Sequence, residues 1–273
     1  MLNKICLPIG VAMAALFAPA ANATIVQFQT VLGPFEVNLY DQNTPATVAN
    51  FLAYVNSGAY NNVVIHRAVN GFVAQGGGFT YQGSQPLGNV VQNAAVVNEP
   101  KYSNVRGTIA MAKLSGNANS ATNQWFINLG NNSANLDVQN GGFTVFGQVI
   151  GNGMDVLDAI NALQKFNFQG AFDSIPLRDY TTQNATDGVE VTDRHLVLVT
   201  SIVVIDGAAN TAANLTPVAN TLINQTTTTP PAPASTGNSG GGGGGGAMGL
   251  GSLLSLGLLS VLRCRRRGSR AAS

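Results

Sequence analysis

The chain has 273 residues, of which 45% are hydrophobic and only 9% are charged, and this apolar fraction is that of a globular protein longer than one ordinary domain. Six of the 13 Lys and Arg residues lie in the terminal segments, which leaves seven against 12 acidic residues, a net charge of about −5. This balance argues against a nucleic-acid-binding protein, which would show a basic stripe.

The first segment, residues 1–23, has the pattern of a secretory signal peptide. Lys4 supplies a positive start, residues 7–18 are apolar, and residues 21–23 form an A-x-A cleavage site. An uncleaved anchor is the alternative, but the apolar run is short for crossing a bilayer. We therefore expect cleavage before Thr24.

Two strands and a helix begin the body of the chain. Residues 24–31 and 34–40 predict two strands, and in the second one apolar and polar residues alternate as in a half-buried strand. Thr44 is expected to cap the helix that follows, with Pro45 at its first position. Gly58 is expected to end that helix.

A hairpin is predicted around Asn70-Gly71, because Asn-Gly between two apolar runs is a strong turn signal. The first run leads into Arg67, and the second begins at Phe72 and includes Gln75. Such a hairpin places these three side chains close together on one face. A lone arginine beside an aromatic ring and an amide is typical of no hydrolase or metal site. It fits a site for a peptide carbonyl.

The rest of the body consists of strands, loops and one more helix. Several strands with only two helices favour an antiparallel barrel or sandwich over a parallel sheet. The body has no cysteine, and His66 and His195 are its only histidines, so neither a disulfide nor a metal cluster is expected. We expect strands at 105–111, 123–129, 143–150 and 195–206, a helix at 154–163, and loops at 83–97, 114–122 and 166–193.

The C-terminal region changes character. Residues 207–246 are rich in Thr, Pro and Gly and predict a flexible linker. Residues 247–262 form a short apolar run, and a cluster of arginines follows within residues 263–273, a membrane signal. A buried helix of a second domain is the alternative, but no other apolar segment nearby would cover it.

This tail resembles the Gly-Gly C-terminal sorting signals of Gram-negative bacteria. The resemblance implies cutting near the glycines by a rhomboid-type protease, followed by transport to the outer face or release. Together with the signal peptide, it predicts an exported protein of the periplasm or cell surface. The tail is then a membrane contact, either transient or a lasting tether.

Three ordered motifs carry a second resemblance. They are His-Arg-x-x-x-Gly-Phe-x-x-Gln-Gly-Gly-x-Phe from His66, Gly-Thr-Ile-Ala-Met-Ala from Gly107 with Asn-Gln-Trp-Phe-Ile from Asn123, and Leu136-Asp137 with Val-Phe-Gly from Val145. Over residues 24–206 the chain is similar to the cyclophilin family of peptidyl-prolyl isomerases, and most of all to its bacterial periplasmic subgroup.

The resemblance implies a mainly β fold, a closed eight-stranded antiparallel β-barrel capped by two α-helices. It implies a monomer without cofactor or metal that acts on proline-containing polypeptides. It assigns catalysis to Arg67, Gln75 and Phe72. Substrate binding falls to Val73, Met111, Ala112, Lys113, Gln124, Phe126, Leu136 and Phe143.

The expected chemistry needs no nucleophile and no acid–base pair. Rotation of an X-Pro bond is slow, because amide resonance raises a barrier of about 18–20 kcal/mol. Arg67 would donate to the lone pair of the twisted prolyl nitrogen, or to the proline carbonyl, while Gln75 holds it in position. Phe72, Phe126 and Leu136 would grip the proline ring, and His66 is expected to be a hydrogen-bonded structural residue.

The sequence departs from the family at several positions. Lys113-Leu114 stands where many eukaryotic members have Asn-Ala, and Phe143 replaces a histidine. Asn135 replaces an aromatic residue that contributes to cyclosporin binding, which predicts weak affinity for that drug. The 166–193 loop is longer than in bacterial members. A non-catalytic proline-peptide-binding or surface-displayed module therefore remains an alternative, and a membrane-tethered adhesin rests on the tail alone.

Overall fold

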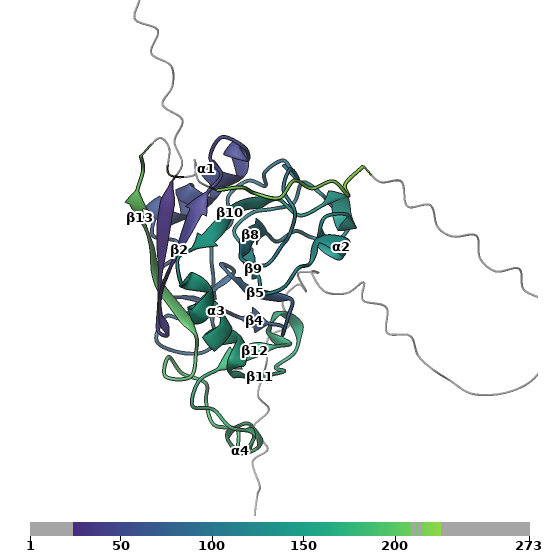
Figure 1. Ribbon diagram of the computed structural model, residues 1–273. Helices are drawn as coiled ribbons and strands as arrows, with labels where there is room; N and C mark the ends of the chain where they lie inside the picture. The colour runs from purple at the N-terminus through teal and green to yellow at the C-terminus, as the bar shows by residue number, and fades with distance from the viewer. Residues whose placement is uncertain (1–23, 209–210, 212–214, 225–273) are drawn as a thin grey trace, which may run out of the picture.

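The computed structural model describes residues 24–208, 211 and 215–224 (Figure 1). The predicted signal peptide at 1–23 and the predicted membrane segment at 247–273 lie outside the described residues. Within the described part, no helix combines the length and hydropathy needed to cross a membrane. The prediction of a membrane contact therefore stays a prediction.

The described residues are mainly β, as expected. The helices are α1 (Pro45–Asn56), α2 (Ser133–Leu136), α3 (Gly153–Ala162) and α4 (Thr182–Thr186), with 3-10 turns η1 (Gln139–Gly141) and η2 (Gly170–Phe172). The strands are β1 (Ile25–Thr30), β2 (Gly33–Leu39), β3 (Val63–Val64), β4 (Arg67–Ala68), β5 (Val73–Gly76), β6 (Phe79–Thr80), β7 (Gly88–Asn89), β8 (Thr108–Met111), β9 (Trp125–Asn128), β10 (Val145–Ile150), β11 (Gln164–Phe166), β12 (Ile175–Leu177) and β13 (Leu198–Asp206).

One 11-stranded antiparallel sheet forms the body, in the order β4-β5-β9-β8-β10-β2-β1-β13-β3-β6-β7. Its strands β3 and β4 are separated in the chain only by Ile65 and His66, yet β4 stands at one end of this order and β3 near the other. Ile65 N donates to Val197 O, while His66 N donates to Gln75 O. The sheet therefore curls until its two ends approach each other at this segment.

A closed eight-stranded barrel was expected, and the prediction of closure is wrong. Among the described residues the end strands β4 and β7 are not paired with each other, so the sheet is open and curled. The chain itself, through Ile65 and His66, connects the two ends where a barrel would have a hydrogen-bonded strand pair. A pattern of alternating residues predicts each strand, but not where the ladder of strand pairs is interrupted.

The inner face of the curled sheet holds the main core. Phe28 and Phe35, opposite each other on β1 and β2, stack with ring centroids 4.5 Å apart, and Trp125 meets Phe28 edge-on at 5.1 Å. These rings are 0–2% exposed. Because each fully buried side chain of this size contributes about 1.5–3 kcal/mol, burial alone supports a domain without disulfides.

The two expected longer helices are confirmed as α1 and α3, and both pack on the core. Phe51 of α1 and Leu157 of α3 are 0% exposed. The expected cap of α1 is wrong in its contacts: the Thr44 hydroxyl donates back to Tyr40 O at 3.3 Å. Glu99, from a distant loop, accepts instead from Thr47 N at 2.9 Å. A carboxylate at a helix N-terminus also complements the helix dipole.

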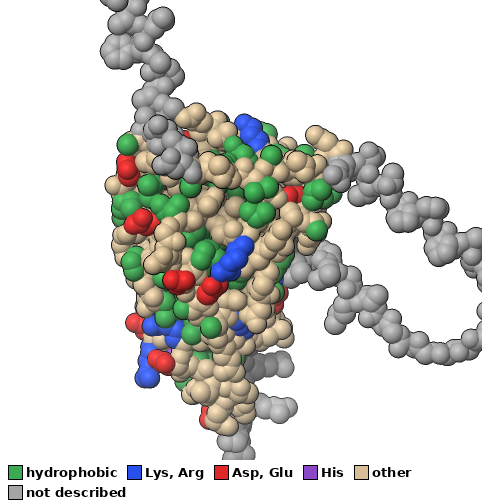
Figure 2. Space-filling model, in the orientation of Figure 1, with side chains coloured by type: hydrophobic (Ala, Val, Ile, Leu, Met, Phe, Trp, Pro, Cys, Tyr) green, Lys and Arg blue, Asp and Glu red, His purple; other side chains and the backbone are tan. Residues whose placement is uncertain are grey.

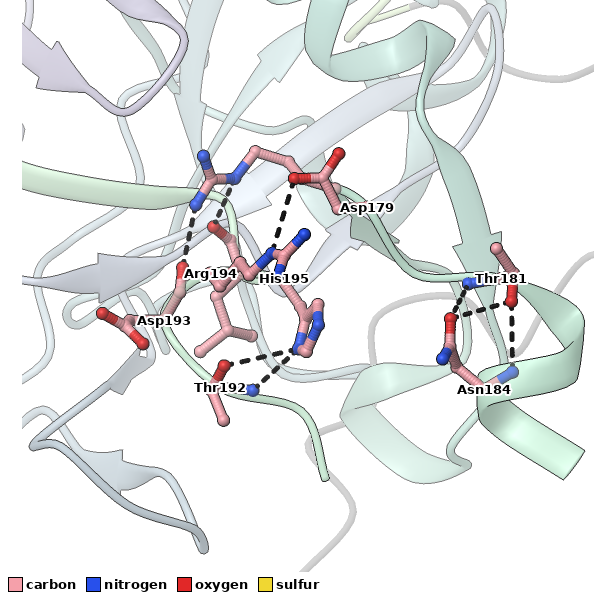
Figure 3. A network of polar contacts seen from close by, with 9 residues as sticks. Asp179, Thr181, Asn184, Thr192, Asp193, Arg194 and His195 are labelled. Carbon is pink, nitrogen blue, oxygen red and sulfur yellow. Dashed lines mark hydrogen bonds and ion pairs between the residues drawn. The ribbon is translucent and has the colours of Figure 1, made fainter. Parts of the chain in front are cut away.

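The region 166–193, expected to be a long loop, has secondary structure and shares a third apolar cluster with residues of β3 and β13. Strands β11 and β12 pair as an antiparallel hairpin, and Phe166 meets Tyr180 edge-on at 5.1 Å. Its apolar residues lacked a period because several short elements share them. Figure 3 shows the polar contacts beyond this hairpin, where Thr181 and Asn184 form a capping box at α4 and Thr192 N donates to His195 Nδ1.

Part of the expected flexible linker lies against the domain. Tyr102 and Ala219 form an antiparallel bridge, and Ser103 N donates to Val218 O at 2.8 Å. The Asn220 side chain donates to Asp137 O at 2.9 Å. Residues 215–224 therefore add a short extended segment beside residues 101–103 and end near α2 (Figure 1). Composition alone did not reveal these pairings.

Candidate active site

The site is built on the β4–β5 hairpin, which is confirmed. Val69 N donates to Val73 O at 2.9 Å, and Gly71 at the turn has φ +67°. Arg67 lies directly opposite Gln75 in the strand register. Directly opposed residues of an antiparallel pair point to the same face, so both side chains lie on the same side of the sheet.

The register extends this row across the sheet. Gln75 is opposite Phe126 on β9, Phe126 is opposite Ala110 on β8, and Ala110 is opposite Val145 on β10. Phe126, Ala110 and Val145 belong to a second apolar cluster, separate from the main core. The arginine, the glutamine and this cluster therefore occupy one face, and the main core lies on the other.

The glycines after Gln75 let two strands come close together. Gly77 has φ +82°, and a Cβ there would lie 2.5 Å from Asn123 O. A Cβ on Gly78 would lie 2.8 Å from the Gln124 side chain. A larger residue at Gly77 or Gly78 would clash with residues 123–124, so glycine is required at both positions.

Arg67 is buried with only part of its guanidinium paired. The residue is 4% exposed, and Nε donates to Asp173 Oδ1 at 3.2 Å. Nη1 and Nη2 are buried and have no hydrogen-bond acceptor among the described residues. Burial lowers the pKa of Arg67, and the charge and hydrogen bond of Asp173 oppose that shift. A buried unpaired donor costs about 1–3 kcal/mol, more when charged, so these donors are poised for an acceptor.

The side chain of Gln75 is hydrogen-bonded to Gln124. Its Nε2 donates to Gln124 Oε1 at 2.8 Å, and its Oε1 is buried with no donor among the described residues. Among the described residues no hydrogen bond joins Gln75 to Arg67, and the acceptor for Arg67 Nε is Asp173, so the expectation that Gln75 holds Arg67 in position stays a prediction. Gln124 pairs with the Gln75 amide nitrogen and so leaves the unpaired acceptor Oε1 on the face that Gln75 shares with Arg67.

The second apolar cluster contains most of the predicted proline-binding residues. Phe126 and Phe143 meet edge-on with ring centroids 5.8 Å apart, and Leu136 packs with them. These three are 1% exposed, Val73 is 2% exposed, and Phe72 is the partly exposed member at the turn. These members of the cluster are thus almost fully buried, and Phe72 is the member among them that reaches solvent.

A chain of buried amide side chains is hydrogen-bonded to the backbone carbonyl of Phe72. Asn132 Nδ2 donates to Phe72 O at 2.8 Å and to Asn128 Oδ1 at 2.7 Å. Asn128 Nδ2 donates to Asn104 Oδ1 at 3.2 Å, and Asn104 Nδ2 donates to Asp137 Oδ1 at 3.0 Å. Satisfied buried polar networks of this kind rigidify their surroundings. The turn that carries Phe72 is therefore held in one conformation.

Of three consecutive predicted substrate-binding residues, two lie away from the site and one lies in the second apolar cluster. Met111 is 0% exposed in the main core, on the opposite face from Arg67, so its side chain does not reach the site. Ala112 lies in the second apolar cluster. Lys113 Nζ donates to Asn140 O at 2.9 Å and Gly142 O at 2.6 Å, and it lies 4.8 Å from the Phe143 ring centroid. Lys113 therefore ties down the turn before Phe143 instead of facing a ligand.

His66 is a buried structural residue, as expected. It is 1% exposed and meets Phe79 edge-on at 4.9 Å. Burial lowers the pKa of His66 to about 3, a hydrogen bond with the Val64 backbone opposes that shift, and the charge of Arg67 adds to it. A neutral ring at ordinary pH takes no part in acid–base chemistry. Within the described part, no three His, Cys, Asp or Glu side chains come together to hold a metal ion.

Comparison with known proteins decides the family. The family model described as cyclophilin type peptidyl-prolyl cis-trans isomerase/CLD matches residues 25–185, more than half of the chain. The chain belongs to the cyclophilin family.

This cyclophilin has bacterial relatives of similar length to its domain. Peptidyl-prolyl cis-trans isomerase A of Dickeya dadantii is 41% identical over 176 residues, which cover 62% of this chain and 88% of that protein. Peptidyl-prolyl cis-trans isomerase B of Escherichia coli is 35% identical over 171 residues, 59% of this chain and 98% of that protein. A crystal structure of a Cryptosporidium parvum cyclophilin type isomerase aligns with a TM-score of 0.49 at 20% identity, over 68% of this chain and 99% of that chain.

Sequence reasoning missed two residues that shape the site of this cyclophilin. Asp173 lies 106 positions from Arg67 in a region without a period, and nothing in the local sequence announces the pairing. Asn132 lies 60 positions from Phe72. Residues 104–132 are rich in Asn, but this composition does not indicate which residue each amide contacts.

The buried His66 predicts a pH dependence of stability. Its pKa is lower in the folded state than the ordinary value near 6.5, so the unfolded chain binds a proton first as pH falls. Its contribution to stability is complete above pH 6.5 and is lost as pH falls toward 3, by up to about 1.4 kcal/mol per pH unit. Urea unfolding from pH 7 to pH 4 should give a steeper loss for the wild type than for His66→Phe. Parallel curves for the two proteins would contradict the assignment.

Proposed function

We propose that this chain catalyses cis–trans isomerisation of X-Pro bonds in polypeptides, with Arg67 as the donor that stabilises the twisted amide. One observation carries the proposal: Nη1 and Nη2 of Arg67 are buried without an acceptor among the described residues, on the same face as the Phe126 cluster. Membership of the cyclophilin family and relatives named as peptidyl-prolyl cis-trans isomerases support the same reaction.

The polar groups of the site match a peptide in their pattern. Arg67 offers unpaired donors and Gln75 offers an unpaired acceptor, Oε1, in adjacent strands. A peptide unit presents the complement, a carbonyl acceptor and an N–H donor. Because these groups are fixed by the sheet and by Asp173 or Gln124, they need little reorganisation when charge shifts in the substrate.

The reaction makes and breaks no bond. As the X-Pro amide twists, resonance is lost and the prolyl nitrogen regains a lone pair. A guanidinium donor pairs with that lone pair or with the proline carbonyl, and it does so more strongly in the twisted state than in either planar state. Arg67 and Gln75 are buried, 4% and 6% exposed, and hydrogen bonds are stronger in such a low-dielectric setting than in water. Phe72, at the edge of the apolar cluster, is the proposed contact of the proline ring.

Substitution of Arg67 tests the proposal. In a protease-coupled assay with an Ala-Pro peptide, Arg67→Ala should lower kcat/KM by about 100-fold or more, the effect of removing one preorganised donor. Arg194→Ala is the matched control, because Arg194 is an exposed arginine paired only loosely with Asp179 at 3.8 Å, and it should keep the full rate. Equal rates for wild type and Arg67→Ala would refute the role of Arg67. Peptide binding by the wild type without acceleration would favour the non-catalytic module.

We also propose that the protein is exported and that cleavage before Thr24 produces its mature N-terminus. Thr24 N donates to Asp41 Oδ2 at 2.9 Å, and the Thr24 hydroxyl donates to Asp41 Oδ1 at 2.8 Å. After cleavage that nitrogen becomes a charged ammonium group, so the contact turns into an ion pair that anchors β1. The proposed sorting tail supports the same export route, with the isomerase acting on exported polypeptides.

Mass spectrometry of the protein recovered from its host tests the export proposal. The expected N-terminal residue is Thr24, and the C-terminal mass shows whether cutting occurs near Gly240–Gly246. Asp41→Asn should lower the free energy of unfolding of the processed protein by about 1 kcal/mol or more, since it removes the charge partner. Its effect on the unprocessed chain should be smaller. A mature protein that keeps residues 1–23 would contradict the proposal.

A further inference from the structure

The segment from η2 to β12 lies directly along the strand that carries Arg67. Ala68 N donates to Ser174 O at 2.8 Å, so this segment continues the hydrogen bonding at the free edge of β4. Phe172 anchors it by packing on Phe79, with ring centroids 4.7 Å apart, and on the edge of His66 at 6.4 Å. Figure 1 shows β12 beside β4. The residue between these two anchors, Asp173, therefore has a fixed place.

Asp173 is placed to act on Arg67 alone. Its Oδ1 accepts from Arg67 Nε at 3.2 Å, and the side chains are 42% and 5% exposed, respectively. The pair is thus asymmetric, since a buried cation meets a carboxylate that reaches solvent. Because the cation is buried, loss of Asp173 would leave Nε unpaired and would lower folding stability. Folding stability by itself does not explain why Asp173 pairs with Nε and leaves both Nη groups unpaired within the described residues.

The contact has a clear effect on geometry. A guanidinium is planar, so a hydrogen bond at Nε fixes the rotation of the whole group. Asp173 uses Nε and leaves both Nη groups unpaired within the described part of the chain. Gln75 gives no hydrogen bond to Arg67, since its amide nitrogen is paired with Gln124. Asp173 is therefore the side chain that decides where the Nη donors point.

We propose that Asp173 is a positioning residue for Arg67 in the isomerase reaction. This inference rests on the proposed function and adds a role for the 166–193 region. Asp173 does not touch the substrate. It holds the guanidinium in the plane that presents Nη1 and Nη2 to the twisting amide, and its negative charge compensates part of the cost of burying the cation. Without it, the side chain gains alternative rotamers, and small misplacements of a catalytic group are costly in rate.

The test compares Asp173→Ala and Asp173→Asn in the full chain, with Asp158→Asn as the matched control. Asp158 also pairs with an arginine, Arg106, but that pair is exposed on both sides, at 45% and 50%. Asp173→Ala should lower kcat about 10-fold or more while KM changes less than two-fold, because ground-state binding is kept. Asp173→Asn keeps an acceptor for Nε and should recover part of the rate. Asp158→Asn should match the wild type.

Two further measurements separate positioning from folding. Asp173→Ala leaves a buried donor unpaired and should lower the urea midpoint, whereas Asp173→Asn should stay closer to the wild type. The Arg67 Nε–Hε signal in a ¹H–¹⁵N spectrum, recorded without urea, should shift in both Asp173 variants. A loss of kcat in Asp173→Ala that disappears once the rate is divided by the folded fraction of the protein would assign Asp173 to folding and overturn the proposal.

The two proposals fail in different ways. A wild-type rate in Asp173→Ala, with Arg67→Ala inactive, would overturn the role of Asp173 and leave the proposed function intact. A wild type that does not accelerate isomerisation at all would overturn both.

Discussion

A buried, half-paired guanidinium is the constraint on which the site depends. A charged group that is 4% exposed needs partners, yet only Nε of Arg67 has one among the described residues. The rest of the architecture follows from holding this group in place. The hairpin register sets Arg67 opposite Gln75, and the segment around Asp173 fixes the plane of the guanidinium. The unpaired donors then cost free energy until an acceptor arrives, which is a property of a binding site and not of a core.

Local patterns were enough to predict the elements that frame the site. Asn70-Gly71 predicted the hairpin, and strand alternation predicted β2, β9 and β10 to within a few residues. The hairpin register places Arg67 opposite Gln75, so that part of the site was accessible from sequence, whereas Phe126 was assigned to the site only through the family resemblance. Met111 was misplaced, since consecutive residues of a strand point to opposite faces and the motif does not say which face binds.

Long-range pairings were beyond the reach of the sequence. Asp173 meets Arg67 across 106 positions, and Glu99 caps α1 from 52 positions away at Thr47. The same holds for Asn220, which reaches Asp137 across 83 positions from a stretch that composition marked as linker. Each contact depends on how the sheet curls. The resemblance implied a closed barrel, and the sheet is open. Charge patterns gave little information about these long-range contacts, because uncharged polar side chains and backbone dominate the face that Figure 2 shows.

The central claim is that the substrate amide meets the Nη donors of Arg67, and one measurement addresses it directly. The guanidinium ¹H–¹⁵N signals of Arg67, assigned by their loss in Arg67→Ala, are followed while an Ala-Pro peptide is added to saturation. The Nη signals should shift strongly, because the unpaired Nη groups gain an acceptor from the peptide. The Nε signal should shift little, because Nε stays paired with Asp173. Nη signals that do not move at saturation would contradict the account.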